Sequence, residues 1–171
     1  MIQIRYNCFE TNSSSTHTLV ISKEMPTHFP ETVSLSIGEF GWEQEEYDTV
    51  EARASYFYTA ACALYGYDVK RDVQKLLEPY GIKVSYEYWK VTEPQFIIYE
   101  KCGHAYLNNG YIDHDMELRE FVDRCFNEPD FLVRWLFGAT SRLYTGNDNT
   151  DDDDRDFNID PITEEVYEKW N

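Results

Sequence analysis

Residues 48–65 read DTVEARASYFYTAACALY, and their apolar side chains recur every three or four residues. That spacing predicts a helix with one buried face. The face comprises Val50, Ala54, Phe57, Ala61, Leu64 and Tyr65. Asp48 with Glu51 resembles a capping box, and Gly66 is a typical residue after a helix end.

The pattern on both sides of this helix changes to alternation of apolar and polar residues, which is typical of strands. Strands are predicted at 2–6, 18–22, 33–37, 82–91, 95–100 and 141–145. Further helices are predicted at 68–77, 118–126 and 131–137, with a helical turn at 164–170. Asn109-Gly110 between apolar flanks predicts a hairpin.

Helices and strands therefore come in blocks rather than in strict alternation, which favours an α+β fold. We expect a single domain with a mostly antiparallel sheet and about four helices. The globular part is expected over residues 1–146. Residues 147–171 are expected to form an acidic loop and a C-terminal tail that packs on this domain or extends from it.

Composition excludes several classes of protein. The chain has 171 residues, of which 42% are hydrophobic and 16% aromatic, so it can bury a core and is not globally disordered. It carries 32 acidic and 15 basic residues, a formal charge of −17. Nucleic-acid binders and proteins that adsorb to anionic membranes need basic surfaces, so neither nucleic acid nor a membrane is an expected direct partner.

The remaining general features indicate the cytoplasm. No apolar run is long enough for a membrane-spanning helix, and the N-terminus lacks the apolar stretch of a signal peptide. The four cysteines are widely spaced, which indicates free and mostly buried thiols in a reducing compartment. We expect no cofactor.

The negative charge is concentrated in two stretches. Residues 39–51 contain no Lys or Arg and six acids, namely Glu39, Glu43, Glu45, Glu46, Asp48 and Glu51. Residues 143–171 contain ten acids against two basic residues, and this stretch includes Asp151, Asp152, Asp153 and Asp154.

Two interpretations of this charge stay open. The first is a solvated surface with a disordered acidic tail. The second is a surface that imitates the phosphates of a nucleic acid and fits the basic groove of another protein. In the second case Phe40, Trp42 and Tyr47, which lie between the acids, would anchor the partner.

A calcium loop is a third interpretation of the C-terminal acids. Oxygen-bearing residues match the ligand positions of such a loop at Asp154, Asp156, Asn158, Asp160 and Glu165. However, Ile159 stands where the sharp turn requires glycine, and Pro161 follows soon after. We therefore expect no metal site.

The segment FETNSSSTH, residues 9–17, is rich in hydroxyl and amide side chains. Such side chains bond to nearby backbone, so a tight connection between strands is one interpretation. The other is a polar cradle for a phosphate or carboxylate, with Ser13, Ser14 or Ser15 as nucleophile and His17 as base. This second interpretation predicts a hydrolase or transferase that acts on a phosphorylated or nucleotide substrate.

The strings FETNSSSTHTLVI (9–21) and GEFGW (38–42) resemble a group of uncharacterised proteins from bacteriophages and Gram-positive bacteria. The resemblance covers roughly the first quarter of the chain, and no activity transfers with it. It implies a phage-type protein acting inside a bacterial cell. Small acidic proteins of that origin include inhibitors of host defence such as anti-CRISPR proteins.

We therefore expect an inhibitor rather than an enzyme, one that binds a host protein with a basic nucleic-acid-binding groove. A homodimer stays open.

Overall fold

The computed structural model describes residues 15–41, 43–66, 69–86, 97–99, 104–106, 110–112, 118–147 and 159–169. These residues form an α+β fold with one cluster of buried hydrophobic side chains, as the sequence predicts. The helices are α1 (Val50–Tyr65), α2 (Val69–Leu77), α3 (Arg119–Asn127) and α4 (Pro129–Phe137), with a 3₁₀ turn η1 (Glu78–Tyr80) after α2.

The main sheet has four antiparallel strands in the order β10-β1-β9-β4. These strands are β1 (Ser15–Ser22), β4 (Glu45–Tyr47), β9 (Arg142–Asn147) and β10 (Glu164–Lys169). The other strands form pairs: β2 (Thr32–Leu35) with β5 (Lys83–Tyr86), β3 (Glu39–Phe40) with β8 (Tyr111–Ile112), and β6 (Ile97–Tyr99) with β7 (His104–Tyr106). The first two pairs are parallel and the third is antiparallel.

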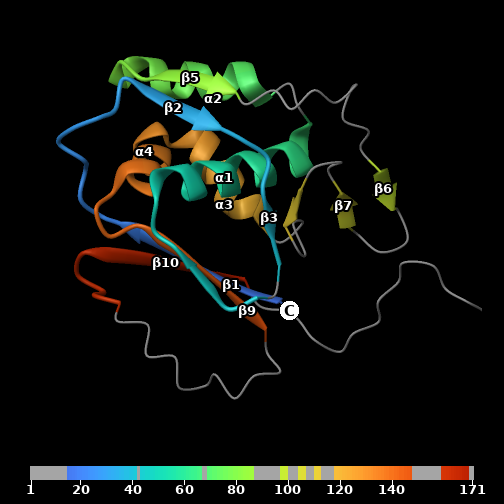
Figure 1. The fold of residues 1–171 in the computed structure, drawn as a ribbon. Helices are drawn as coiled ribbons and strands as arrows, with labels where there is room; N and C mark the ends of the chain where they lie inside the picture. Colours follow the sequence, from blue (N-terminus) through green and yellow to red (C-terminus); the bar gives the residue numbers. More distant parts are fainter. Residues whose placement is uncertain are drawn as a thin grey trace, which may run out of the picture.

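Helices α1, α3 and α4 lie between two layers of strands (Figure 1). Figure 1 shows α1, α3 and α4 with the four-stranded sheet on one side and the β2–β5 pair on the other. Because strands cover it on both sides, α1 is buried around its whole circumference from Arg53 to Cys62. The single buried face predicted for this helix is therefore too narrow, since a helix in the middle of a layered domain has no solvent face.

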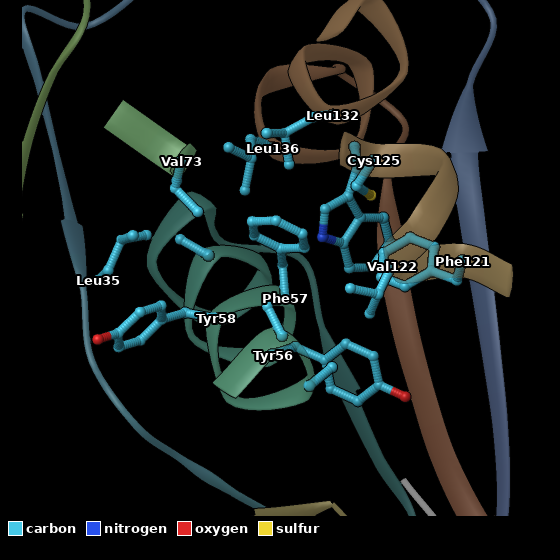
Figure 2. Close-up of a cluster of buried hydrophobic side chains, with 14 of the residues drawn as sticks. Leu35, Tyr56, Phe57, Tyr58, Val73, Phe121, Val122, Cys125, Leu132 and Leu136 are labelled. Atoms are coloured by element: carbon cyan, nitrogen blue, oxygen red, sulfur yellow. The ribbon is translucent and has the colours of Figure 1, made fainter. Parts of the chain in front are cut away.

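The side chains of α1 reach neighbours in several directions. Figure 2 shows Phe57 directed toward Leu132 and Leu136 of α4, whereas Tyr56 and Tyr58 point to opposite sides of α1. All of these side chains are at most 3% exposed. The helix thus holds the helical layer and both strand layers together.

Two local predictions are wrong. Residues 164–169 form strand β10 instead of a helical turn, because their backbone pairs with β1 and Tyr167 packs on the ring of Phe131. Thr49, and not Asp48, caps α1: its hydroxyl accepts a hydrogen bond from the Ala52 N–H at 3.2 Å. Strand β8 pairs with β3, and residues 107–109 of the predicted Asn109-Gly110 hairpin lie outside the described residues. The predicted strand 2–6 lies outside the described residues.

Candidate functional site

The acidic segment, residues 39–51, contains β3, β4 and the first two residues of α1. Within the described part of the sheet, β4 is the outermost strand on its side. All six carboxylates of the segment are exposed: Glu39, Glu43, Glu45, Glu46, Asp48 and Glu51. The structure therefore presents a run of negative charge at a sheet edge and at a helix start.

The carboxylates of the acidic segment form no ion pair with any Lys or Arg that the structure describes. The described ion pairs involve other acids: Lys75–Asp72 at 3.0 Å, Arg124–Glu128 at 3.1 Å, Arg124–Glu165, and Arg142–Glu164 at 2.7 Å. Arg53 attracts Asp48 and Glu51 electrostatically. The carboxylates of Glu39, Glu43, Glu45 and Glu46 are exposed and form no ion pair with the described Lys and Arg residues. An exposed array of this kind produces a local negative potential.

Some of these carboxylates have a structural role of their own. Asp48 and Glu51 lie at the N-terminal end of α1, where the helix dipole favours negative groups. Glu45 and Glu46 are on an outer strand, where charged side chains discourage pairing with the edge of another sheet. The same argument applies to Glu39 on the two-stranded β3–β8 pair. Neither effect accounts for the exposed carboxylate of Glu43.

The described aromatic residues of the segment are less exposed to a binding partner than the sequence suggests. Phe40 is only 3% exposed and packs edge-on against Tyr56 and Tyr47, with ring centroids 4.9 and 5.4 Å away. It belongs to the core, so its expected role as a partner anchor is wrong. Tyr47 is partly buried and donates its hydroxyl to the Glu45 carboxylate. Burial and that carboxylate raise the pKa of Tyr47. Trp42 lies outside the described residues.

Most C-terminal acids also lie outside the described residues, including Asp151–Asp154 and the calcium candidates Asp154, Asp156 and Asn158. Asp160 closes a turn: its carboxylate accepts from the Ile162 N–H at 2.9 Å and from the Thr163 hydroxyl at 3.0 Å. Glu165 pairs with Arg124. Both described candidates thus contact other protein groups, and the described residues contain no cluster of His, Cys, Asp or Glu placed to hold a metal ion.

The described end of the hydroxyl-rich segment, residues 15–17, lies in strand β1 of the main sheet. Ser15 and His17 are in β1 and fully buried, while Ser13 and Ser14 lie outside the described residues. The imidazole of His17 contacts the Tyr56 hydroxyl through Nδ1 and the Gly41 carbonyl through Nε2, both at 2.9 Å. A histidine enclosed in this way contacts core groups rather than a substrate, so the described residues lend the hydrolase or transferase hypothesis no support.

Sequence reasoning missed the partners of His17. Tyr56 is 39 positions away along the chain and Gly41 is 24 positions away. Tyr56 is one of several aromatic residues in α1, and a backbone carbonyl leaves no trace in the sequence. Only the packing of α1 against β1 brings the three groups together.

A hollow of about 250 Å³ opens beside the start of α1. Its polar wall includes His28, Thr32, Ser34 and Glu51, and its apolar wall includes Phe137. Because it contains Glu51, the hollow adjoins the acidic segment.

In the described residues, no helix has both the length and the apolar character needed to cross a membrane. Comparison of the whole chain with known protein families, with curated proteins and with solved structures finds no match.

Proposed function

We propose that this protein is an inhibitor that acts by binding: its acidic segment occupies a basic nucleic-acid-binding groove of another protein and excludes nucleic acid from it. The observation that carries this proposal is the run of exposed carboxylates in residues 39–51, which form no ion pair with any described Lys or Arg. A chain of formal charge −17 repels nucleic acid itself, so the partner is the protein that binds it.

The physical basis is electrostatic complementarity. Carboxylates along a strand and a helix start present an array of negative charges, as the phosphates of a nucleic acid do. Such an array accelerates encounter with a basic surface and rejects acidic partners. Because salt screens the attraction and groove-bound counterions are released, the complex weakens as the salt concentration rises.

The target we propose is a nucleic-acid-handling or defence protein of a bacterial host, and the site of action is the bacterial cytoplasm. The resemblance of residues 9–21 and 38–42 to phage proteins supports this choice. An anti-CRISPR-like role is one form of the proposal.

The test compares the native chain with the charge-reversed variant E43K/E45K/E46K. Each protein is immobilised, exposed to a bacterial lysate at low and at moderate salt, and washed with duplex DNA. We expect the native chain to retain a nucleic-acid-binding protein that moderate salt or the DNA releases. The charge-reversed variant is expected to lose it.

A matched control reverses the same number of charges elsewhere, in E24K/E31K/E78K, whose acids are exposed and outside the acidic segment. This control should retain the captured protein. Equal loss in both variants would show that total charge matters rather than this segment, and a capture insensitive to salt and DNA would refute mimicry of a nucleic acid.

A further inference from the structure

Buried side chains from three different elements hold the backbone of the acidic segment and of the residue just before it. His17 of β1 donates from Nε2 to the Gly41 carbonyl at 2.9 Å, and the Thr145 hydroxyl of β9 donates to the Glu43 carbonyl at 2.6 Å. Just before the segment, the Gly38 N–H donates to Thr59 Oγ1 of α1 at 2.9 Å. The segment is therefore fixed to the core at several points instead of hanging from it as a loose loop.

His17 occupies the central position in this arrangement. A carbonyl oxygen only accepts hydrogen bonds, so Nε2, which faces Gly41, must carry a proton. In the neutral imidazole, Nδ1 then accepts the hydroxyl proton of Tyr56 at 2.9 Å. His17 and Tyr56 are both 0% exposed, so these bonds form away from competing water. Through them, α1 orients the imidazole and the imidazole holds Gly41.

Phe40 reinforces the same point of attachment. Its ring packs edge-on against Tyr56, with centroids 4.9 Å apart, while the adjacent Gly41 is held by His17. One buried tyrosine thus contacts both the ring of Phe40 and the histidine that binds its neighbour. Along the chain, Glu39 precedes this fixed pair and Glu43 follows it two residues after Gly41.

Resting on the proposed function, we infer that His17 is a positioning residue: it holds the acidic segment in one conformation and so presents its carboxylates at fixed spacing to a basic partner. Binding by a loose segment requires that segment to be ordered, and the ordering lowers affinity. A segment ordered in advance avoids this loss. The role predicted for His17 is therefore to raise affinity without contacting the partner or changing the charge of the surface.

The test uses two substitutions at this position. H17L introduces an apolar side chain of moderate size and removes both hydrogen bonds. H17Q restores a donor, because the amide nitrogen of Gln is as many bonds from Cβ as Nε2 of His. The matched control is V73A on α2, a fully buried core position outside the acidic segment and its attachments, which lowers stability alone.

The probe is a fluorescent, lactam-bridged helical peptide with an arginine on every turn, because a rigid partner responds most to the spacing of the carboxylates. Fluorescence anisotropy measures its affinity, and hydrogen exchange of the amides in residues 39–47 measures order in the segment. We expect H17L to weaken binding about fivefold and to speed exchange, whereas H17Q and V73A stay within about twofold of the native chain.

The outcomes separate the two proposals. If E43K/E45K/E46K abolishes binding but H17L binds as tightly as the native chain, the role of His17 is overturned and the proposed function stands. If E43K/E45K/E46K binds as well as the native chain, the proposed function fails, and the inference fails with it. Should H17L not fold, T145V replaces it, since this variant removes the tie to the Glu43 carbonyl and a hydroxyl contact with Tyr47. Native-like affinity and exchange in T145V would then overturn the inference that fixing the segment raises affinity.

Discussion

Replacing Arg53 with methionine tests how much its hydrogen bonds between α1 and the end of α4 stabilise the fold. Arg53 is 4% exposed, and its guanidinium donates to the Leu136 carbonyl from Nε at 3.2 Å and from Nη2 at 2.8 Å. Nη1 donates to the Asp48 carbonyl at 2.9 Å and to the Ser141 carbonyl. The Leu136 carbonyl belongs to the last turn of α4 and has no partner within that helix, so Arg53 supplies a cation and donors where the helix dipole is negative.

The expected loss of unfolding free energy is the balance of two opposing contributions. Burial lowers the pKa of Arg53 to about 10, which leaves the group charged at neutral pH. Each hydrogen bond from a charged donor contributes about 1.5–3 kcal/mol, and a carbonyl left buried without a donor adds a similar penalty. Removing the charge also relieves a desolvation cost of several kcal/mol. We expect the R53M variant to lose about 3 kcal/mol of unfolding free energy.

Urea denaturation followed by circular dichroism measures this loss. With a slope of about 2 kcal/mol per molar urea, the midpoint of R53M should fall by about 1.5 M. The matched control R71M changes an exposed arginine of α2 and should stay within about 0.5 kcal/mol of the native chain. An R53M midpoint equal to that of R71M would show that the guanidinium network contributes no net stability and would refute this reasoning.

Three further predictions concern other buried groups. Hydrogen bonds to Glu164 outweigh its burial and lower its pKa from 4.5. As the pH falls, Glu164 therefore binds a proton at a higher pH in the unfolded chain than in the folded chain. The stabilisation of the fold by ionised Glu164 is thus present at neutral pH and is lost as the pH falls through the folded-state pKa. E164Q should flatten the acid side of a curve of urea midpoint against pH, and an unchanged acid side would contradict this. Burial raises the pKa of Cys62 to about 12 and that of Cys125 well above its usual value. In a variant with the other two cysteines replaced by serine, a thiol reagent at mild pH should react only after urea unfolding, and rapid labelling of the folded chain would count against burial. A Cβ at Gly138 would lie 2.3 Å from the Arg134 carbonyl oxygen, so G138A should lower the unfolding free energy by about 1–3 kcal/mol; a midpoint at or above the native value would show that this turn relaxes freely.

Local pattern was sufficient for the helices. The apolar repeat that begins at Val50 predicted α1, and the repeats at 68–77, 118–126 and 131–137 predicted α2, α3 and α4 within a few residues of their bounds. The apolar repeat predicts the helices correctly because each helix must bury apolar side chains at that spacing. The block order of elements likewise predicted the α+β class.

Long-range pairing was not predictable in this way. The string EEVYEKW is rich in helix-forming residues, yet residues 164–169 form a strand because β1 offers an antiparallel edge and α3 and α4 supply packing for Tyr167. His17 resembled a catalytic residue beside serines, and only the position of α1 against β1 turns it into a buried support of Gly41.

The sequence by itself therefore determined the fold class, the helices and the concentration of carboxylates in residues 39–51, because composition and periodicity are properties of short stretches of chain. The tertiary structure decided which of these groups face solvent. It left the carboxylates exposed, placed Phe40 in the core, and joined β1, α1 and the acidic segment through His17. These outcomes depend on contacts between residues tens of positions apart, which no local pattern encodes.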